Sequence, residues 1–459
     1  MSRSEVGWRR HGAAAFACLG GVLLGLSLLK LGNPVILDRL VRPPTSLWEA
    51  LFEPWPVAWG YGLLAVVALL GVAIRFSRAG TPPASAGPSV GGRGRWRGRL
   101  VVLPALWLAW QGLAASRTIE PRLTWPTLVH FGAVVAGFYA ALFVLARSRG
   151  GEVFWTALLI GFLLMLWVGF GQHYGGLEET RRYIYSQPGW EQLPPEQLKR
   201  LGSNRIFATL LYPNTLAGVL LLLLPAMLVT VWRGTHRWHR LAGAVATGLL
   251  AYAGSACLVW SGSKAGWLIA LAMGWVLLLH LPLPRVAKWL LLAGLLLAGL
   301  AGFFLRFSTY FSKGATSVGA RFDYWAAGWK TACRYPWLGA GPGTFSVTYA
   351  RLKPPRAEMA RLAHNDYLEQ ASDSGFIGAA LYLAFVAGSL VVLHRTVRGD
   401  PRRFAVWLGL LGWALQGCVE FGLYIPATAW TGFWLLGWLW GRGTGPRHAL
   451  GQADLRPRR

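Results

Sequence analysis

His364 is the side chain in this sequence whose type suits acid–base chemistry, and it opens the segment His364-Asn365-Asp366-Tyr367. A histidine exchanges a proton near neutral pH, so it can serve as a general base that takes a proton from a hydroxyl. The spacing from His364 to Ala371 predicts a helix whose start places the histidine beside the membrane surface. We expect the next three residues, Asn365, Asp366 and Tyr367, to support the histidine. The alternative is a structural role as a capping residue.

Three basic side chains suggest a binding site for an anion. Arg205 lies where a polar interval meets an apolar run. There its guanidinium can hold a phosphate through two hydrogen bonds. The alternative is that the side chain only extends its charge to the membrane surface. Arg321 can pair with Asp323 or bind an anion, and Lys264 lies at the outer end of an apolar run. A pyrophosphate is the natural ligand, because a departing pyrophosphate needs its developing charge neutralised. The absence of a close pair of aspartates disfavours a metal-based site.

Two further polar side chains fall within predicted apolar helices. Asn214 follows Pro213 one or two turns inside such a helix, which costs energy unless the pair packs on protein or lines a cavity. Glu420 follows Gln416 by one turn, so we expect both on one face of a membrane helix. An acid in such a helix is a candidate site residue, and a satisfied salt bridge is the alternative.

The elements that position these residues are membrane helices. The chain has 459 residues, of which 54% are hydrophobic and 14% charged, and apolar runs of roughly 20 residues recur along it. This predicts an all-α polytopic membrane protein rather than a soluble core. The formal net charge of +27 comes from basic residues in alternate loops, which indicates topology rather than nucleic-acid binding. The four cysteines show no pairing pattern, so we expect neither a disulfide framework nor a metal site.

About twelve membrane spans are expected, with both termini in the cytoplasm. The first seven cover about residues 13–31, 57–76, 100–115, 127–146, 153–170, 207–232 and 241–260. The eighth ends near residue 281 and the ninth near residue 305. The tenth and eleventh cover about 376–394 and 404–423, and the twelfth ends near residue 440. The first lacks a small-residue cleavage site, so we expect it to stay uncleaved.

The polar intervals take their expected roles from this topology. We expect residues 44–52 to form a short helix in the membrane interface. Residues 78–99 have the composition of a disordered linker that faces the inside. Pro194 indicates the start of a helix. Intervals 171–205 and 306–375 lie outside, and the second reads as one long, structureless functional loop between spans 9 and 10.

Three regions follow from this topology, and they are read as domains. Residues 1–170 hold the first five spans. Residues 171–378 hold the core with its outside loops and spans 6–9. Residues 379–459 hold the last spans and a basic cytoplasmic tail.

Four motifs stand in order between residues 171 and 378. They are Asn204-Arg205 with Pro213-Asn214-Thr215-Leu216-Ala217, Ser261-Gly262-Ser263-Lys264, Arg321-Phe322-Asp323-Tyr324-Trp325 with Pro336-Trp337-Leu338-Gly339-Ala340-Gly341, and Ala363-His364-Asn365-Asp366-Tyr367-Leu368. In order, spacing and topology they resemble the O-antigen ligase and polymerase superfamily, with its "R…NPN-x-LA", "S-x-S-R-G-A", "P-x-x-G-x-G" and "AHN-x-YL" segments. Lysine stands at position 264, where the family usually has arginine.

The resemblance implies a membrane glycosyltransferase of the GT-C type in the bacterial inner membrane, with its active site facing the periplasm. Such enzymes build lipopolysaccharide and other polysaccharides. They move a glycan from an undecaprenyl-pyrophosphate carrier to an acceptor such as lipid A-core or a growing polysaccharide, and they use no metal, nucleotide sugar or other cofactor. Ligase, polymerase and protein glycosylation all stay open, because the acceptor alone distinguishes them.

The resemblance also implies roles for single residues. Arg205 and Arg321 would hold the pyrophosphate, and Lys264 would keep the charge of the usual arginine without its two-pronged geometry. His364 would activate the acceptor hydroxyl for in-line displacement with inversion. Asn214, Asn365, Asp366, Tyr367 and Glu420 are the expected supporting residues.

A transporter of solutes or lipids is the alternative from another functional class. Transporters of this size typically have broken helices and paired polar residues at mid-membrane in both halves. Here the ionisable residues gather at the outer edge, which favours chemistry at the membrane surface.

Overall fold

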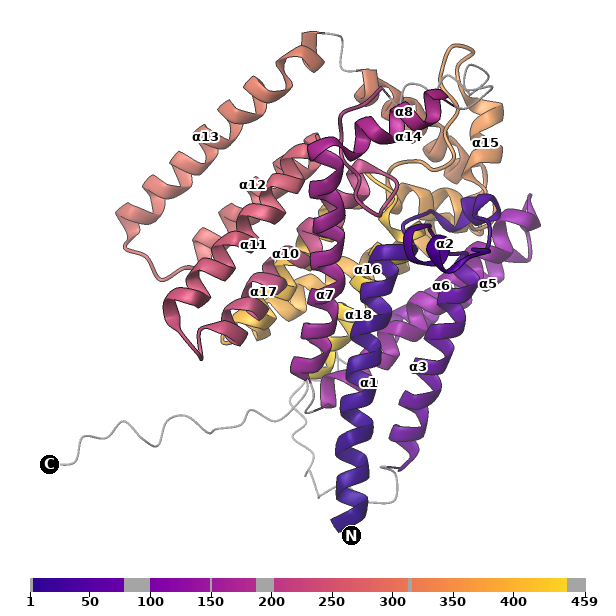
Figure 1. The fold of residues 1–459 in the computed structure, drawn as a ribbon. Helices are drawn as coiled ribbons and strands as arrows, with labels where there is room; N and C mark the ends of the chain where they lie inside the picture. The colour runs from indigo at the N-terminus through magenta and orange to yellow at the C-terminus, as the bar shows by residue number, and fades with distance from the viewer. Residues whose placement is uncertain (1–2, 78–99, 149–150, 187–201, 313–315, 444–459) are drawn as a thin grey trace, which may run out of the picture.

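The chain forms a bundle of long helices with shorter helices over one end (Figure 1). The structure, a computed structural model, describes residues 3–77, 100–148, 151–186, 202–312 and 316–443, and within these ranges it contains helices and no strand. The all-α prediction is therefore confirmed. The expected linker at residues 78–99 and the expected helix start at Pro194 lie outside the described residues.

The long helices coincide with the apolar runs of the sequence. They are α1 (Arg3–Lys30), α3 (Val57–Ser77), α5 (Leu103–Ala115), α6 (Pro121–Phe143), α7 (Gly151–Gly171), α10 (Pro213–Thr235), α11 (Arg240–Trp260), α12 (Lys264–His280), α13 (Arg285–Ser312), α16 (Asp366–Val397), α17 (Pro401–Gln416) and α18 (Pro426–Gly443). Eight helical segments in the described part of the chain are long and apolar enough to cross a membrane. The helices α5, α12, α17 and α18 are not among them. The protein is thus polytopic, and the count of twelve spans stays a prediction.

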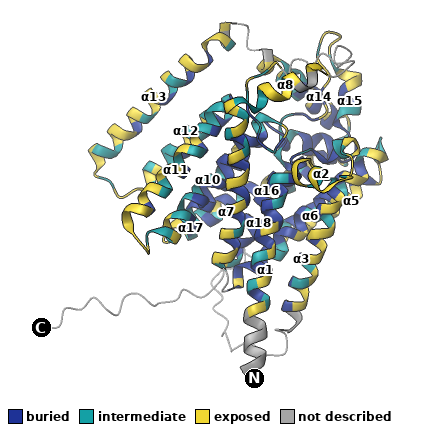
Figure 2. Cartoon of the chain, in the orientation of Figure 1, coloured by how far each residue is buried: buried dark blue, intermediate teal, exposed yellow. Residues whose placement is uncertain are grey.

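The centre of the bundle is formed by α18, which packs against α6, and by α10, which packs against α17 (Figure 2). Every residue from 423 to 440 is buried. Because α18 is apolar on all sides, a central position in the bundle buries more of its apolar surface than a peripheral position would. In contrast, α13 packs mainly on α12 and leaves large apolar side chains exposed, among them Leu297 at 70% and Leu305 at 79%. Such a surface suits contact with lipid.

Short helices gather at the end of the bundle where α16 begins (Figure 1). They are α2 (Leu47–Phe52), α8 (Leu177–Ser186), α14 (Thr316–Arg334) and α15 (Phe345–Leu352), together with the short segments Val35–Leu40, Gln172–Gly176 and Gly422–Tyr424. A further short segment, Leu145–Arg147, follows α6 at the opposite end of the bundle, where Ala146 lies against Gly441 at the end of α18. The prediction of a short helix within residues 44–52 is confirmed, since Ser46 caps α2 by accepting a hydrogen bond from the backbone N–H of Glu49 at 3.1 Å.

The interval 306–375 is not the structureless loop that its composition predicts. It contains the end of α13, all of α14 and α15, and the first turns of α16. In α14 the buried residues Tyr324, Ala327 and Thr331 recur at helical spacing. Polar residues between them hid this pattern, because α14 buries only one face.

A glycine-rich turn docks these short helices onto α16. The helix α16 is kinked at residues 374–375, which leaves two backbone carbonyls without helical partners. The carbonyls of Ser372 and Asp373 instead accept hydrogen bonds from the N–H groups of Ala340 and Gly341, each at 2.9 Å. At Gly339, with φ of +64°, a Cβ atom would lie 2.3 Å from the Asp373 carbonyl carbon, so only glycine fits this approach.

Candidate active site

Glu420 is the hub of a polar cluster at the end of the bundle under α14. Its Oε1 accepts hydrogen bonds from Asn214 Nδ2 at 2.6 Å and from Arg321 Nη2. Its Oε2 lies 3.1 Å from His364 Nδ1. The residue Glu420 is only 6% exposed. Three segments that are far apart in the sequence therefore meet on one buried acid.

Glu420 occupies a turn and not the membrane helix that we expected for it. The helix α17 ends at Gln416, so Gln416 and Glu420 do not share a helix face. The turn is anchored by Asp366, whose N–H donates to the Gly417 carbonyl at 2.7 Å and whose carboxylate accepts from the N–H of Leu423 at 3.1 Å. Because Asp366 lies two residues after His364, it fixes the acid relative to the histidine.

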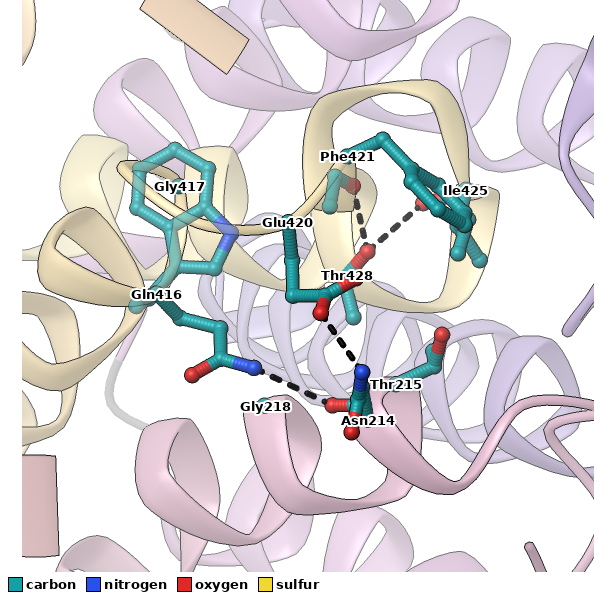
Figure 3. A pocket seen from close by; sticks show the side chains of 11 residues that line it. Asn214, Thr215, Gly218, Gln416, Gly417, Glu420, Phe421, Ile425 and Thr428 are labelled. Atoms are coloured by element: carbon teal, nitrogen blue, oxygen red, sulfur yellow. Dashed lines mark hydrogen bonds between the residues drawn. The ribbon is translucent and has the colours of Figure 1, made fainter. Parts of the chain in front are cut away.

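Asn214 also lies at the start of a helix and not inside one. The helix α10 begins at Pro213, a position where proline is favoured because it has no N–H to satisfy. Residues 207–212, which the apolar pattern placed within the span, are not helical. The side chain of Asn214 consequently reaches across to Glu420, while its backbone carbonyl accepts from Gln416 Nε2 at 3.2 Å (Figure 3).

Little space remains on the α10 side of Glu420. The cavity there, lined among others by Asn214, Glu420 and Thr428, has a volume of about 10 Å³ (Figure 3). Such a volume holds at most about one water. Arg321 and His364 lie on a more open side of the cluster, where their side chains are 19% and 28% exposed.

His364 is held in one orientation between aromatic rings. The Tyr324 ring stacks on it at 5.7 Å between centroids, and Phe421 meets it edge-on at 4.7 Å. Its backbone has φ of +52°, a conformation that side-chain-bearing residues rarely adopt, and the N-cap residue Asn365 follows at once. When Nδ1 donates to Glu420, the neutral ring has its lone pair on Nε2, which has no hydrogen-bond partner among the described residues.

Arg205 lies beside this cluster and is bonded to it through Asn214. Its Nη2 donates to Asn214 Oδ1 at 2.6 Å, and its Nε donates to the Ser261 carbonyl at 2.7 Å. The turn after Ser261 includes Gly262 with φ of +59°, where a Cβ atom would come within 3.1 Å of Arg205 Nε. This glycine allows the backbone to approach the guanidinium closely.

Lys264 stands apart from the hydrogen-bonded cluster. It is the first residue of α12, whose N-cap Ser263 accepts from the N–H of Gly266. Its ammonium lies 3.9 Å from the centroid of the Tyr310 ring and 5.1 Å from that of Phe307. Both rings stabilise the cation without neutralising it.

The electrostatic balance of the site is positive. Burial by itself would raise the pKa of Glu420, but the charges and hydrogen bonds of His364 and Arg321 outweigh it and hold this pKa below its ordinary value. Glu420 is therefore ionised at neutral pH. Arg205 and Arg321 share this one carboxylate, and Lys264 lies close enough to both guanidinium groups to interact with their charges. The positive charge is therefore not fully compensated and favours an anion. Arg321 pairs with Glu420 rather than with Asp323, the partner that its sequence neighbourhood suggested.

Residues 249–383 match the family model described as O-antigen ligase. The chain thus carries an O-antigen ligase domain. No curated protein matches the sequence. The predicted resemblance is confirmed at the level of the superfamily.

The O-antigen ligase domain supplies part of the cluster and the flanking segments supply the rest. Lys264, Arg321 and His364 lie within residues 249–383. Arg205 precedes the matched range and Glu420 follows it. The cluster consequently forms only when the domain packs against α10 and the turn after α17.

Glu369, a polar neighbour of His364 in the sequence to which we assigned no role, also supports the site. It is fully buried, and its Oε2 accepts from the N–H of Ala363 at 2.9 Å, directly before His364. A second supporting contact, which involves a residue that was selected, joins the hydroxyl of Tyr367 to the Ala414 carbonyl at 2.9 Å. The signal for Glu369 was an acid in the first turn of the helix that leads into the apolar run after Gly375.

Proposed function

We propose that the protein is a glycosyltransferase that moves a glycan from an undecaprenyl-pyrophosphate carrier to an acceptor hydroxyl at the periplasmic face of the bacterial inner membrane. The O-antigen ligase domain supports the reaction class. The observation that carries the proposal is the contact of His364 with Glu420 beside Arg205 and Arg321. It joins a base to a positively charged surface, as displacement of a pyrophosphate requires.

In the proposed reaction Nε2 of His364 accepts the proton of the acceptor hydroxyl. The acceptor oxygen forms a bond to the anomeric carbon of the donor while the bond from that carbon to the pyrophosphate oxygen breaks. The pair of electrons leaves with the pyrophosphate, and the anomeric configuration inverts. Glu420 accepts the hydrogen bond of Nδ1 and stabilises the imidazolium that forms.

The leaving pyrophosphate is assigned to the cations. Arg205 and Arg321 offer planar guanidinium groups, which match phosphate oxygens, and Lys264 adds a compact charge. In this proposal protein charges do the neutralising, so a metal ion is not required. Proton release by the imidazolium to water or to the product completes the cycle.

The topology forms part of the same proposal. Twelve spans, with α5, α12, α17 and α18 counted alongside the eight candidates, would place the ends of α7 and α11 and the start of α16 on one side of the membrane. The positive-inside pattern assigns that side to the periplasm. Residues 171–378 would then act as the catalytic core, between two flanking groups of helices.

The test is transfer by the purified protein. Donors with a glycan on undecaprenyl pyrophosphate are mixed with candidate acceptors in lipid vesicles, and the product linkage is determined by NMR. We expect a new glycosidic bond with inverted configuration and release of the carrier pyrophosphate. Transfer to a lipid core indicates a ligase, and extension of a carrier-linked chain indicates a polymerase of the same superfamily. A protein that transfers to neither, under conditions where it stays folded, contradicts the proposal.

A further inference from the structure

A second, larger cleft lies beside the cluster and has no role in the chemistry described above. Its volume is about 410 Å³, within the roughly 300–1,000 Å³ typical of small-ligand sites. It lies where the segment Gln172–Gly176, the helix α8, the end of α11 and α13 come together. Residues that line it include His173, Glu178, Arg181, Asn204, Trp260 and Arg306.

One wall of the cleft is aromatic. The ring of His173 lies parallel to that of Trp260, with 3.8 Å between centroids and 8° between planes. His173 is exposed, and the adjacent Tyr174 is 71% exposed. Exposed ring faces beside a polar cleft are the surface on which the C–H face of a sugar stacks, since one side of a pyranose is apolar.

The other wall carries hydrogen-bonding groups. Arg181 donates to Glu178 Oε2 at 2.9 Å and to Asn204 Oδ1 at 2.5 Å. Glu178 and Asn204 thereby add a carboxylate and an amide, groups that can bond hydroxyl groups, to this wall. Arg306 lines the same cleft and has no carboxylate partner among the described residues. Apolar ring faces opposite paired donors and acceptors fit a carbohydrate better than a lipid tail.

The cleft is continuous with the cation cluster through the backbone. Asn204 precedes Arg205, and Trp260 precedes Ser261, whose carbonyl accepts from Arg205 Nε at 2.7 Å. Consecutive Cα atoms are about 3.8 Å apart. For a glycan whose pyrophosphate or reacting end lies at Arg205, the cleft is therefore the neighbouring surface on the side of Asn204 and Trp260.

We propose that this cleft binds sugar residues of the substrate glycan, with His173 as the stacking surface. The inference rests on the proposed transferase function. It assigns the cleft to carbohydrate, which is present on the donor and on the acceptor alike. Titration of each substrate separately distinguishes the two sources.

The experiment compares wild type with His173→Ala, His173→Tyr and the control Trp167→Ala. Trp167 is 78% exposed on α7, the helix that leads into the cleft, and it does not line the cleft. Transfer rates by the purified proteins are measured with donors that carry either one sugar or several repeat units. Donor and acceptor are varied in turn.

For His173→Ala we expect KM for the longer glycan to rise about three- to tenfold, the size of a lost stacking contact, with kcat unchanged. His173→Tyr, which keeps a ring, restores KM, and Trp167→Ala leaves it unchanged. The substrate whose KM rises is the one that occupies the cleft. If His173→Ala leaves every KM at the wild-type value while wild type transfers normally, the cleft proposal is overturned and the transferase proposal stands. Absence of transfer by wild type overturns the transferase proposal instead.

Discussion

His364 Nδ1 lies 3.1 Å from Glu420 Oε2, although 56 residues separate the two in the sequence. The contact orients the imidazole and directs its second nitrogen away from the acid. The same carboxylate is bonded to Asn214 and Arg321, so the proposed base and the proposed anion-binding groups share one support. Changes at Glu420 should therefore affect both proton transfer and binding of the donor.

Glu420→Gln tests this shared support. The amide oxygen can still accept from Asn214 and Arg321, but the charge that stabilises a protonated His364 is lost. We expect transfer to fall by about 10²-fold or more, by analogy with removal of the acid in a Ser-His-Asp triad. The measurement is kcat/KM for the donor with the purified variant. A variant with near-wild-type kcat/KM would remove Glu420 from the mechanism.

The depressed pKa of Glu420 predicts a dependence of stability on pH. A carboxyl group whose folded-state pKa is below the unfolded value adds stability above the unfolded value, here about 4.5, and loses it as pH falls through the folded value. The difference in Tm between wild type and Glu420→Gln should thus be constant above about pH 5.5 and shrink below pH 4.5. Thermal unfolding in detergent at several pH values measures it. A difference that shrinks between pH 6 and 8 would contradict the ionised state assigned to Glu420.

Arg205 and Lys264 should respond differently to exchange of the cation. Arg205 uses two nitrogen atoms to hold Asn214 and Ser261, so Arg205→Lys loses this geometry and should reduce kcat/KM by roughly 10–100-fold. Lys264 contributes charge from outside the cluster, so Lys264→Arg should stay within about threefold of wild type. Lys264→Ala should weaken inhibition by inorganic pyrophosphate. Equal losses in Arg205→Lys and Lys264→Arg would show that the two cations are not distinguished as the structure suggests.

Glu369 is predicted to position His364. Glu369→Gln keeps an oxygen that can accept from the buried N–H of Ala363, whereas Glu369→Ala leaves that group unsatisfied at a cost of about 1–3 kcal/mol. We expect the alanine variant to lose activity and Tm and the glutamine variant to keep most of both. Loss of kcat without loss of donor binding would distinguish positioning from general destabilisation. Equal behaviour of the two variants would contradict the role assigned to the hydrogen bond.

Gly262→Ala tests the turn that places Arg205. A left-handed backbone costs an L-residue roughly 1–2 kcal/mol, and the added methyl group would press on Arg205. We expect KM for the donor to rise and Tm to fall. Gly248→Ala, in the helix α11 that precedes this turn and with open space around it, is the control. A Gly262→Ala variant with unchanged KM would mean that the turn does not determine the position of Arg205.

Much of the fold follows from the sequence because a chain in lipid must satisfy its backbone hydrogen bonds within helices. Apolar runs located the long helices in this way. The boundary after Gln416 was missed since the sequence remains largely apolar through the turn that follows. The helix α14 was missed since only one of its faces is apolar.

The residues of the candidate site also divide into those that the sequence predicts and those that it does not. His364, Arg205 and Arg321 were selected from residue type and motif, which are local properties. The partner of Arg321 could not be predicted in this way. Glu420 lies 99 residues away, and the pairing depends on how α14 packs over the turn after α17. Asp323, two residues away, was the nearest acid and is not the partner.

The central claim is that His364 is the base that releases carrier-linked glycan to an acceptor. The most direct test extracts the lipid carrier from cells that lack this protein and produce wild type, His364→Ala or the control His11→Ala at equal levels. We predict that glycan accumulates on the carrier without the protein and with His364→Ala, and that wild type and His11→Ala clear it. Long polymer on the carrier would identify a ligase, and single repeat units a polymerase. Clearance by His364→Ala at the wild-type level would contradict the account.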